Sequence, residues 1–202
     1  HLSIRRQRQM CIRDSYMGTK FAEAFDIKYL NSDNEHVYAY TTSWGVSTRL
    51  IGALIMVHSD DQGLVLPPKI APQQVVFVPV GPWQKNPAIM QKIEEWQAAL
   101  RAKGVRTYVD DSDNRPGYKF NEWELRGAPV RVDLGPRDLE NDQAVLKMRD
   151  QEDKLTVAGD QLVDQVLQEL ETMQGRLYDR AKAMYQENIY TLSLIHISEP
   201  TR

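Results

Sequence analysis

One arginine, Arg49, lies inside an otherwise apolar segment, residues 46–58. A guanidinium removed from water is costly unless a carboxylate or an anionic ligand lies beside it. Spacing alone favours an ion pair with Asp60 or Asp61. The alternative is a clamp for a phosphate or nucleotide, because the planar guanidinium suits both a phosphate and the face of a base.

Ser43, Trp44 and Gly45 come just before this segment. Because a glycine lets a ligand approach the backbone closely, these three residues are candidates for the wall of a binding pocket. A tight turn beside a core tryptophan would use the same residue types. The residues alone leave both interpretations open.

Residues 110–126 interleave charged and aromatic side chains. The charged ones are Arg115, Lys119, Glu122, Glu124 and Arg126, and the aromatic ones are Tyr118, Phe120 and Trp123. Carboxylates accept hydrogen bonds from base donors, and basic groups hold base acceptors or phosphates, so this mixture suits the recognition of unstacked RNA bases. From the residues alone, a solvated helix face with Phe120 and Trp123 in the core is favoured.

His58 precedes Asp60 and Asp61 and raises the possibility of a metal site or an acid–base pair. One histidine and two carboxylates specify neither, so we expect a structural role. A phosphate-cradling glycine loop, a nucleophile elbow and a zinc-ligand spacing are all missing from the sequence. We therefore expect no metal site and no catalytic residue in this chain.

The elements that carry these residues alternate between strand and helix, which predicts an α/β fold. The first segment, residues 16–72, predicts a hairpin with its turn at residues 31–34 and a helix at 46–58 that is apolar all round and so buried. For the second segment we expect strands at 75–80, 105–109, 130–134 and 144–148, and helices from Asn86 to Gly104 and over 118–126. A long amphipathic helix is expected at 160–188.

Both ends of the chain look foreign, because residues 5–15 and 192–202 resemble translated sequencing-adaptor DNA in opposite orientations. We predict that residues 1–15 and 192–202 are artefacts, which leaves 176 residues. The two ends carry five basic and two acidic residues, so the rest has 20 basic and 26 acidic residues and a net charge of −6. That charge argues against non-specific coating of nucleic acid, and no apolar stretch is long enough to span a bilayer.

Longer runs of the sequence resemble the prolyl-tRNA synthetases of the archaeal/eukaryotic-like type. The similar runs are residues 42–53, 58–72, 116–120, 123–124 and 127–129, Arg131 and residues 135–138. Residues 42–53 look like the third signature motif of class II aminoacyl-tRNA synthetases. The resemblance covers essentially all of residues 16–191.

The resemblance implies a fold in successive parts. The C-terminal part of an antiparallel-sheet catalytic domain occupies residues 16–72, and an α/β anticodon-binding domain, with a mixed sheet and flanking helices, occupies 73–158. The long helix, residues 159–191, would lead toward a missing zinc-binding domain. We therefore expect no zinc site in this chain.

The same resemblance implies that proline and ATP give prolyl-adenylate, and that proline is then transferred to its tRNA. Arg49 would bind ATP, and Ser43, Trp44 and Gly45 would form part of the proline pocket, which reverses the preference for an internal ion pair. The anticodon-reading residues would be Lys119, Glu122, Glu124 and Arg131, with either glutamate accepting from the N1 and N2 donors of guanine.

The expected cofactors of the full-length enzyme are ATP and Mg²⁺, and its expected partners are proline and proline tRNA. We expect a cytoplasmic homodimer that binds neither membrane nor DNA. Since the first two class II motifs are missing, we expect this polypeptide alone to be inactive. Two alternatives are a non-catalytic RNA-binding module and a class II synthetase for threonine, glycine or histidine.

Overall fold

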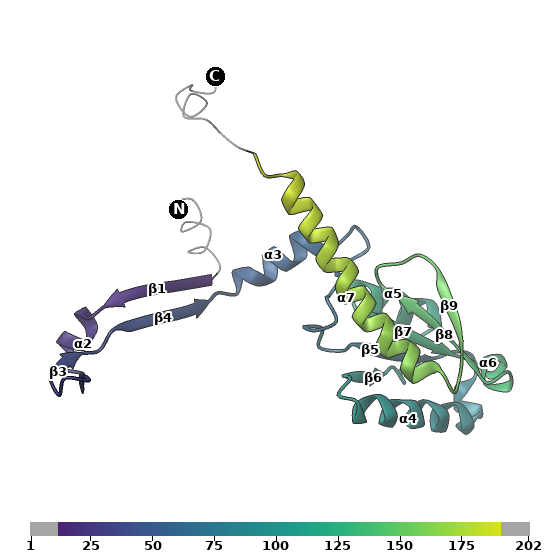
Figure 1. Ribbon diagram of the computed structural model, residues 1–202. Coiled ribbons are helices and arrows are strands. Elements are labelled where there is room, and N and C mark those ends of the chain that lie inside the picture. Colours follow the sequence, from purple (N-terminus) through teal and green to yellow (C-terminus); the bar gives the residue numbers. More distant parts are fainter. Residues whose placement is uncertain (1–11, 191–202) are drawn as a thin grey trace, which may run out of the picture. The chain divides into compact units, whose positions relative to one another are not determined.

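The computed structural model describes residues 12–190. The chain divides into two compact units, residues 1–56 and residues 57–202. The first is built from antiparallel strand pairs, and the second from a five-stranded sheet with helices on both faces (Figure 1).

Two antiparallel strand pairs make up the described part of the first unit. Its elements are β1 (Ile12–Gly18), α2 (Lys20–Ala24), β2 (Lys28–Leu30), β3 (His36–Tyr38) and β4 (Thr41–Val46). Strand β1 pairs with β4, and β2 pairs with β3. Residues 12–15, predicted to derive from adaptor DNA, lie in β1. Because a ladder runs through the backbone, this pairing does not bear on their origin.

The β2–β3 hairpin confirms the predicted turn. The side-chain oxygen of Asn31 accepts hydrogen bonds from the backbone N–H groups of Asp33 and Glu35, each at 2.9 Å. Asn34 adopts a positive φ of 59°. Asparagine tolerates both features, so the residues that predicted the turn also build it.

Helix α3 (Arg49–His58) follows β4, and the prediction that this helix is buried is wrong. None of its residues is buried, and Arg49 at its first position is exposed. An all-round apolar helix is buried only where other elements cover it, and the described residues do not cover α3.

The second unit alternates strands and helices along the chain, as expected for an α/β fold. Its elements are β5 (Val75–Pro79), the 3₁₀ helix η1 (Trp83–Lys85), α4 (Pro87–Ala102), β6 (Thr107–Val109), α5 (Pro116–Leu125), β7 (Val130–Leu134), α6 (Pro136–Glu140), β8 (Gln143–Met148), β9 (Lys154–Ala158) and α7 (Leu162–Glu187). The strand order is β6-β5-β7-β8-β9. Strand β5 is parallel to β6 and β7, whereas β8 is antiparallel to β7 and β9, so the sheet is mixed.

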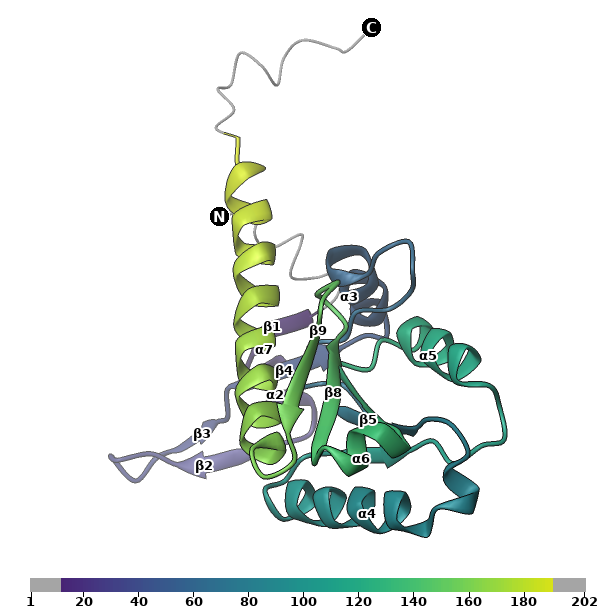
Figure 2. The ribbon, with the colours of Figure 1, turned by 90° about the vertical axis from the view of Figure 1, so that its right-hand side faces the viewer.

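Two helices cover one face of this sheet, and a third helix packs on the other (Figure 2). The larger core combines alternate residues of β5, β7 and β8 with apolar residues of α4 and α7. On the other face, Val76 and Val78 pack with Trp123 of α5 and with Ala128. Successive side chains of a strand point to opposite faces, so each buried strand serves both layers.

Helix α4 begins as predicted. The side chain of Asn86 accepts a hydrogen bond from the backbone N–H of Ala88 at 3.3 Å, and Pro87 occupies the first helical position. Helix α7 buries Leu162, Val166, Leu170, Met173 and Leu177. Spacings of four and three residues place these side chains on one stripe, which packs in the predicted amphipathic manner.

Candidate nucleic-acid interface

Strand β7 carries apolar and charged residues in strict alternation. Val130, Val132 and Leu134 enter the larger core. Arg131 and Asp133 therefore lie on the opposite face of the sheet, the one on which α5 packs. Both are nearly buried, at 5% and 6% exposed. A buried charged pair of this kind must satisfy its charges locally.

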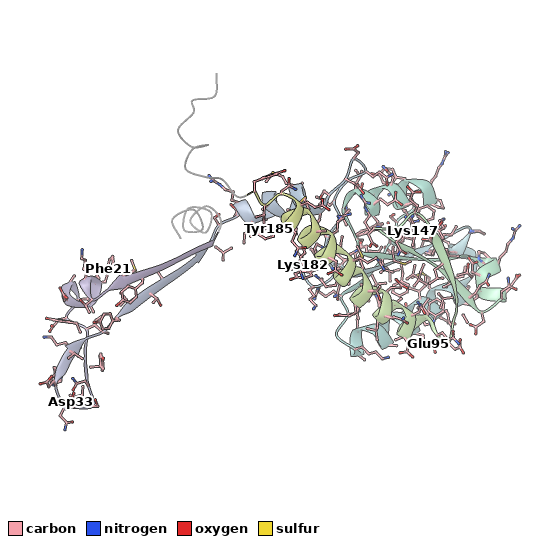
Figure 3. All side chains as sticks on the ribbon, turned by 45° about the horizontal axis from the view of Figure 1, so that its top comes forward. Phe21, Asp33, Glu95, Lys147, Lys182 and Tyr185 are labelled. Carbon is pink, nitrogen blue, oxygen red and sulfur yellow. The ribbon has the colours of Figure 1, made fainter. Side chains whose placement is uncertain are left out.

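A row of basic residues crosses three neighbouring strands on this face. Arg131 of β7 lies opposite Lys147 of β8, and Lys147 lies opposite Lys154 of β9. The Lys147 ammonium, labelled in Figure 3, donates to the carbonyl oxygens of Gln151 and Glu152, each at 2.6 Å. Lys154 is exposed, with its ammonium 5.6 Å from the ring centre of Phe120.

Two carboxylates and an aromatic ring surround the Arg131 guanidinium. Its Nε lies 2.9 Å from an oxygen of Asp133, and one terminal nitrogen lies 3.2 Å from Glu124 Oε1. The guanidinium lies 4.0 Å from the ring centre of Phe120. Burial raises the pKa of Asp133 above its usual 3.8, against the opposing charge of Arg131. The Glu124 side chain is 33% exposed, so it is the accessible carboxylate of the cluster.

A hollow of about 390 Å³ adjoins this cluster and is lined in part by Glu124, Arg131 and Lys147. Its size falls within the range of small-ligand sites. An accessible carboxylate beside positive groups can accept from N–H donors of a ligand while the cations hold its acceptors or a phosphate. Planar, polar groups such as nucleobases present both kinds of edge.

Lys119, predicted to lie on the base-reading surface, is instead buried. It is 1% exposed, and its ammonium donates to the Asp110 carbonyl at 2.8 Å. The Asp110 carboxylate accepts from Trp123 Nε1 at 2.7 Å and from Ser112. Burial acts to raise the pKa of Asp110, but these hydrogen bonds outweigh it and the pKa is lowered. Lys119 therefore holds the loop after β6 in place, and its long stem is part of the packed interior.

The two predicted glutamates have different partners. The Glu122 carboxylate lies 2.6 Å from a terminal guanidinium nitrogen of Arg126, one turn along the same helix. Glu124 instead contacts Arg131 across to the sheet. The structure thus brings together only Glu124 and Arg131 from the four predicted residues. Asp133 could have been found from the alternation in β7, whereas Lys154 lies on a strand that the sequence did not predict.

The predicted ATP and proline residues all lie in the first unit. Ser43, Trp44 and Gly45 are successive residues of β4, paired with β1, and Arg49 opens α3. Ser43, Gly45 and Arg49 are exposed. Asp60, one of the two carboxylates considered as a partner for Arg49, forms a two-pronged ion pair with Arg149 instead.

Within residues 12–190, no group of three or more histidine, cysteine, aspartate or glutamate side chains is arranged to hold a metal ion. His58 lies near Arg180, and burial and that charge lower the pKa of its imidazole. In the same part of the chain, no helix is both long and apolar enough to cross a membrane.

Comparison with known proteins finds a domain family that matches this sheet and most of its helices. Residues 74–169 match the family described as "Anticodon binding domain". The chain is 50% identical over 174 residues to a proline–tRNA ligase of Lachnospira eligens. This alignment covers 86% of this chain and 36% of that protein. A proline–tRNA ligase of Symbiobacterium thermophilum is 49% identical, over 83% of this chain and 34% of that protein.

A third relative, a proline–tRNA ligase of Natranaerobius thermophilus, is 44% identical over 88% of the chain and 37% of its own length. The chain thus spans about a third of the length of the curated relatives it matches. An RNA-binding module unrelated to catalysis, or a synthetase for threonine, glycine or histidine, is not favoured by these relatives. The matched domain and the aligned relatives together make this chain similar, over most of its residues, to about one third of the length of the prolyl-tRNA synthetases.

Proposed function

We propose that the whole protein activates proline with ATP and transfers it to proline tRNA, and that the second unit of this chain reads the anticodon. The observation that carries the proposal is the cluster of Glu124, Arg131 and Asp133 on the polar face of the sheet. The names of the relatives and the matched anticodon-binding domain support it.

The chemistry of guanine fits this cluster. A carboxylate is an acceptor only, and the Watson–Crick edge of guanine offers the N1–H and N2–H groups as neighbouring donors. Glu124 is accessible and is oriented by Arg131 at 3.2 Å, so we propose Glu124 rather than Glu122 as the guanine acceptor. The exposed Lys154 would hold a base acceptor or a phosphate from the same side.

In the first unit, we propose that Arg49 contacts the phosphates of ATP and that Ser43, Trp44 and Gly45 contribute to the proline pocket. The exposure of Arg49 at the start of α3 leaves its guanidinium free of a packed core. Mg²⁺ bound to ATP would neutralise phosphate charge, and it would need only one or two protein carboxylates besides the phosphates. We also propose that the whole protein is a cytoplasmic homodimer and does not bind DNA.

The test of anticodon reading is the binding of the 202-residue chain to a fluorescent stem-loop RNA with the proline anticodon. A second stem-loop replaces its two adjacent guanines with adenines. We expect a preference of about tenfold or more for guanine, because a good paired contact to a base edge contributes about 1–3 kcal/mol of discrimination. Glu124→Gln should abolish most of that preference, since the amide replaces one of the two acceptor oxygens with a donor that opposes a donor of guanine.

Glu122→Gln is the matched control, two residues earlier on the same helix and equal in charge change. It should keep the preference of the unmodified chain. Equal binding of the two RNAs by the unmodified, folded chain would contradict anticodon reading by this unit. A preference that survives Glu124→Gln but not Glu122→Gln would assign the acceptor to the other glutamate.

The test of the first-unit proposal is proline-dependent exchange of pyrophosphate into ATP. The chain alone should show no exchange, because several positioned cations act together on the developing phosphate charge. In a longer polypeptide that is active, Arg49→Ala should lower the exchange rate by 100-fold or more, on the order of an essential phosphate contact. Exchange by the unmodified 202-residue chain would contradict the first expectation.

A further inference from the structure

A tight turn in the second unit fixes the carboxylate of Asp60. The backbone groups of Asp60 and Gly63 exchange two hydrogen bonds, each 3.2 Å long. The Asp60 side chain accepts a further bond from the backbone N–H of Gln62 at 3.0 Å. The carboxylate therefore leaves the turn in one direction, and it does so toward Arg149.

Arg149 joins this turn to helix α5. Its two terminal nitrogens donate to the two Asp60 oxygens at 2.8 and 2.6 Å, and its Nε donates to the backbone carbonyl of Glu124 at 3.0 Å. The Arg149 side chain is only 4% exposed. Because all three contacts come from one planar group, a shift of Asp60 displaces the guanidinium and its bond to Glu124 together.

The turn is also packed directly against the end of α5. The backbone N–H of Leu64 donates to the carbonyl of Leu125 at 3.0 Å. A side-chain carbon at Gly63, whose φ is +135°, would lie 2.6 Å from the α-carbon of Leu125. Only glycine fits there, so the turn is a closely fitted support for the last turn of the helix.

Glu124 is the residue at which this support meets the base-reading cluster. Its backbone carbonyl, in the last turn of α5, accepts from the N–H of Gly127 at 3.1 Å and from Nε of Arg149 at 3.0 Å. Its side chain contacts Arg131 at 3.2 Å. The same residue is thus held by its backbone from one side while its carboxylate faces the proposed guanine.

We propose that Asp60 and Arg149 are positioning residues for Glu124, and that they determine how well the second unit discriminates guanine from closely similar bases. This proposal rests on the proposed function, in which Glu124 is the guanine acceptor. Loosening of the Asp60–Arg149 pair frees the last turn of α5 and misaligns the carboxylate with the N1–H and N2–H donors. Discrimination then falls more than affinity does.

The experiment compares stem-loop RNAs that carry either guanine or inosine at the two anticodon positions. Inosine differs only by the missing 2-amino group, so the ratio of the two dissociation constants reports the alignment of the acceptor. For the unmodified 202-residue chain we expect a ratio of about ten. Asp60→Asn, which keeps the size of the side chain and removes its charge, should lower that ratio about threefold or more.

Asp61→Asn is the matched control, since Asp61 is the next residue along the chain and lines the same hollow. It should leave the ratio unchanged. Arg149→Lys is the second test variant because it keeps the positive charge but cannot donate to both Asp60 oxygens and to the Glu124 carbonyl from one planar group. It should also lower the ratio. Thermal unfolding of each variant shows which are folded, and either test variant suffices if the other is not.

The outcomes separate the two proposals. A ratio near one for the unmodified chain, unaltered by Glu124→Gln, would overturn the proposed function itself. A ratio that Glu124→Gln abolishes but that folded Asp60→Asn and Arg149→Lys leave intact would overturn only the positioning role. Weaker binding of both RNAs by the same factor would mean that the pair serves stability alone, and would also overturn it.

Discussion

The two units of this chain differ most in what lies inside them. The second unit contains three clusters of buried hydrophobic residues, whereas Ala22 is the one buried hydrophobic residue found in the described part of the first. Large side chains there, such as Phe25 and Tyr40, are 73% and 67% exposed. The strands of the first unit are thus held mainly by backbone ladders, which are marginal in water without a packed face.

Charged groups differ between the units in the same way. In the first unit, Asp26 pairs with Lys28, and their own side chains are 73% and 37% exposed. In the second, Arg131 is 5% exposed between Asp133 and Glu124. An exposed pair contributes little, whereas a buried charge that loses its partner is strongly destabilising. Substitutions in the second unit should therefore have the larger effects.

The sharpest test of this difference compares the same substitution in a strand of each unit. Leu146 in β8 is fully buried, and Leu30 in β2 is 54% exposed. Leu146→Ala should lower the free energy of unfolding by about 2–5 kcal/mol, because it leaves a cavity in the larger core. Leu30→Ala should change it by no more than about 0.5 kcal/mol. Urea unfolding measures both, and similar losses would show that the first unit has a core of its own.

A smaller effect is expected from two glycines of the second unit. An alanine at Gly127 would place its side-chain carbon 2.6 Å from the carbonyl oxygen of Leu64, at a φ of +73°. Gly127→Ala should destabilise the unit by about 1–3 kcal/mol. The added carbon of Gly175→Ala in α7 meets no atom within 4 Å. This substitution should instead stabilise the unit by roughly 0.5–1 kcal/mol. Thermal unfolding measures the difference, and equal shifts for the two would contradict the close approach.

The smallest expected effect is on the stability of the fold at acidic pH. The hydrogen bond from Arg149 lowers the pKa of Asp60, and that from Lys28 lowers the pKa of Asp26. A carboxyl with a lowered pKa in the folded state adds stability above its unfolded pKa, near 3.8, and this stability is lost as the pH falls through the folded pKa. Asp60→Asn should therefore reduce the drop in melting temperature between pH 7 and pH 3.

Asp26→Asn is the counterpart of this variant in the first unit. Its ion pair is screened by water, so it should leave the acid-induced drop unchanged. A reduction equal to that of Asp60→Asn would mean that exposure does not separate the two pairs.

Local signals predicted the elements whose ends are marked by the chain itself. Asn86 and Pro87 start α4, the apolar run at residues 75–80 contains β5, and the apolar spacing in α7 predicted the helix and its buried face as far as Leu177. Strand β9 was missed, although its residues alternate between exposed and less exposed positions. Helix α6 was missed because its five residues show no helical period.

The candidate site was only partly predictable, for a reason that lies in tertiary contacts. The sequence placed Lys119, Glu122 and Glu124 on one helix, but only packing against the sheet decides which of them is buried, which pairs locally and which meets Arg131. Along the sequence, Asp60 comes 64 residues before Glu124 and 89 residues before Arg149, the two residues to which it is linked in the fold. Such long-range pairs have no signature in a single sequence.

The burial of side chains is uneven along helix α7, and this has a dynamic consequence. Its last buried residue is Leu177, although the helix continues to Glu187. Lys182 and Tyr185, labelled in Figure 3, belong to this last part, and Tyr185 is 68% exposed. Local opening costs least where few side chains are packed. Amide hydrogens of one continuous helix should therefore exchange with solvent on two timescales, slowly up to Leu177 and much faster beyond it.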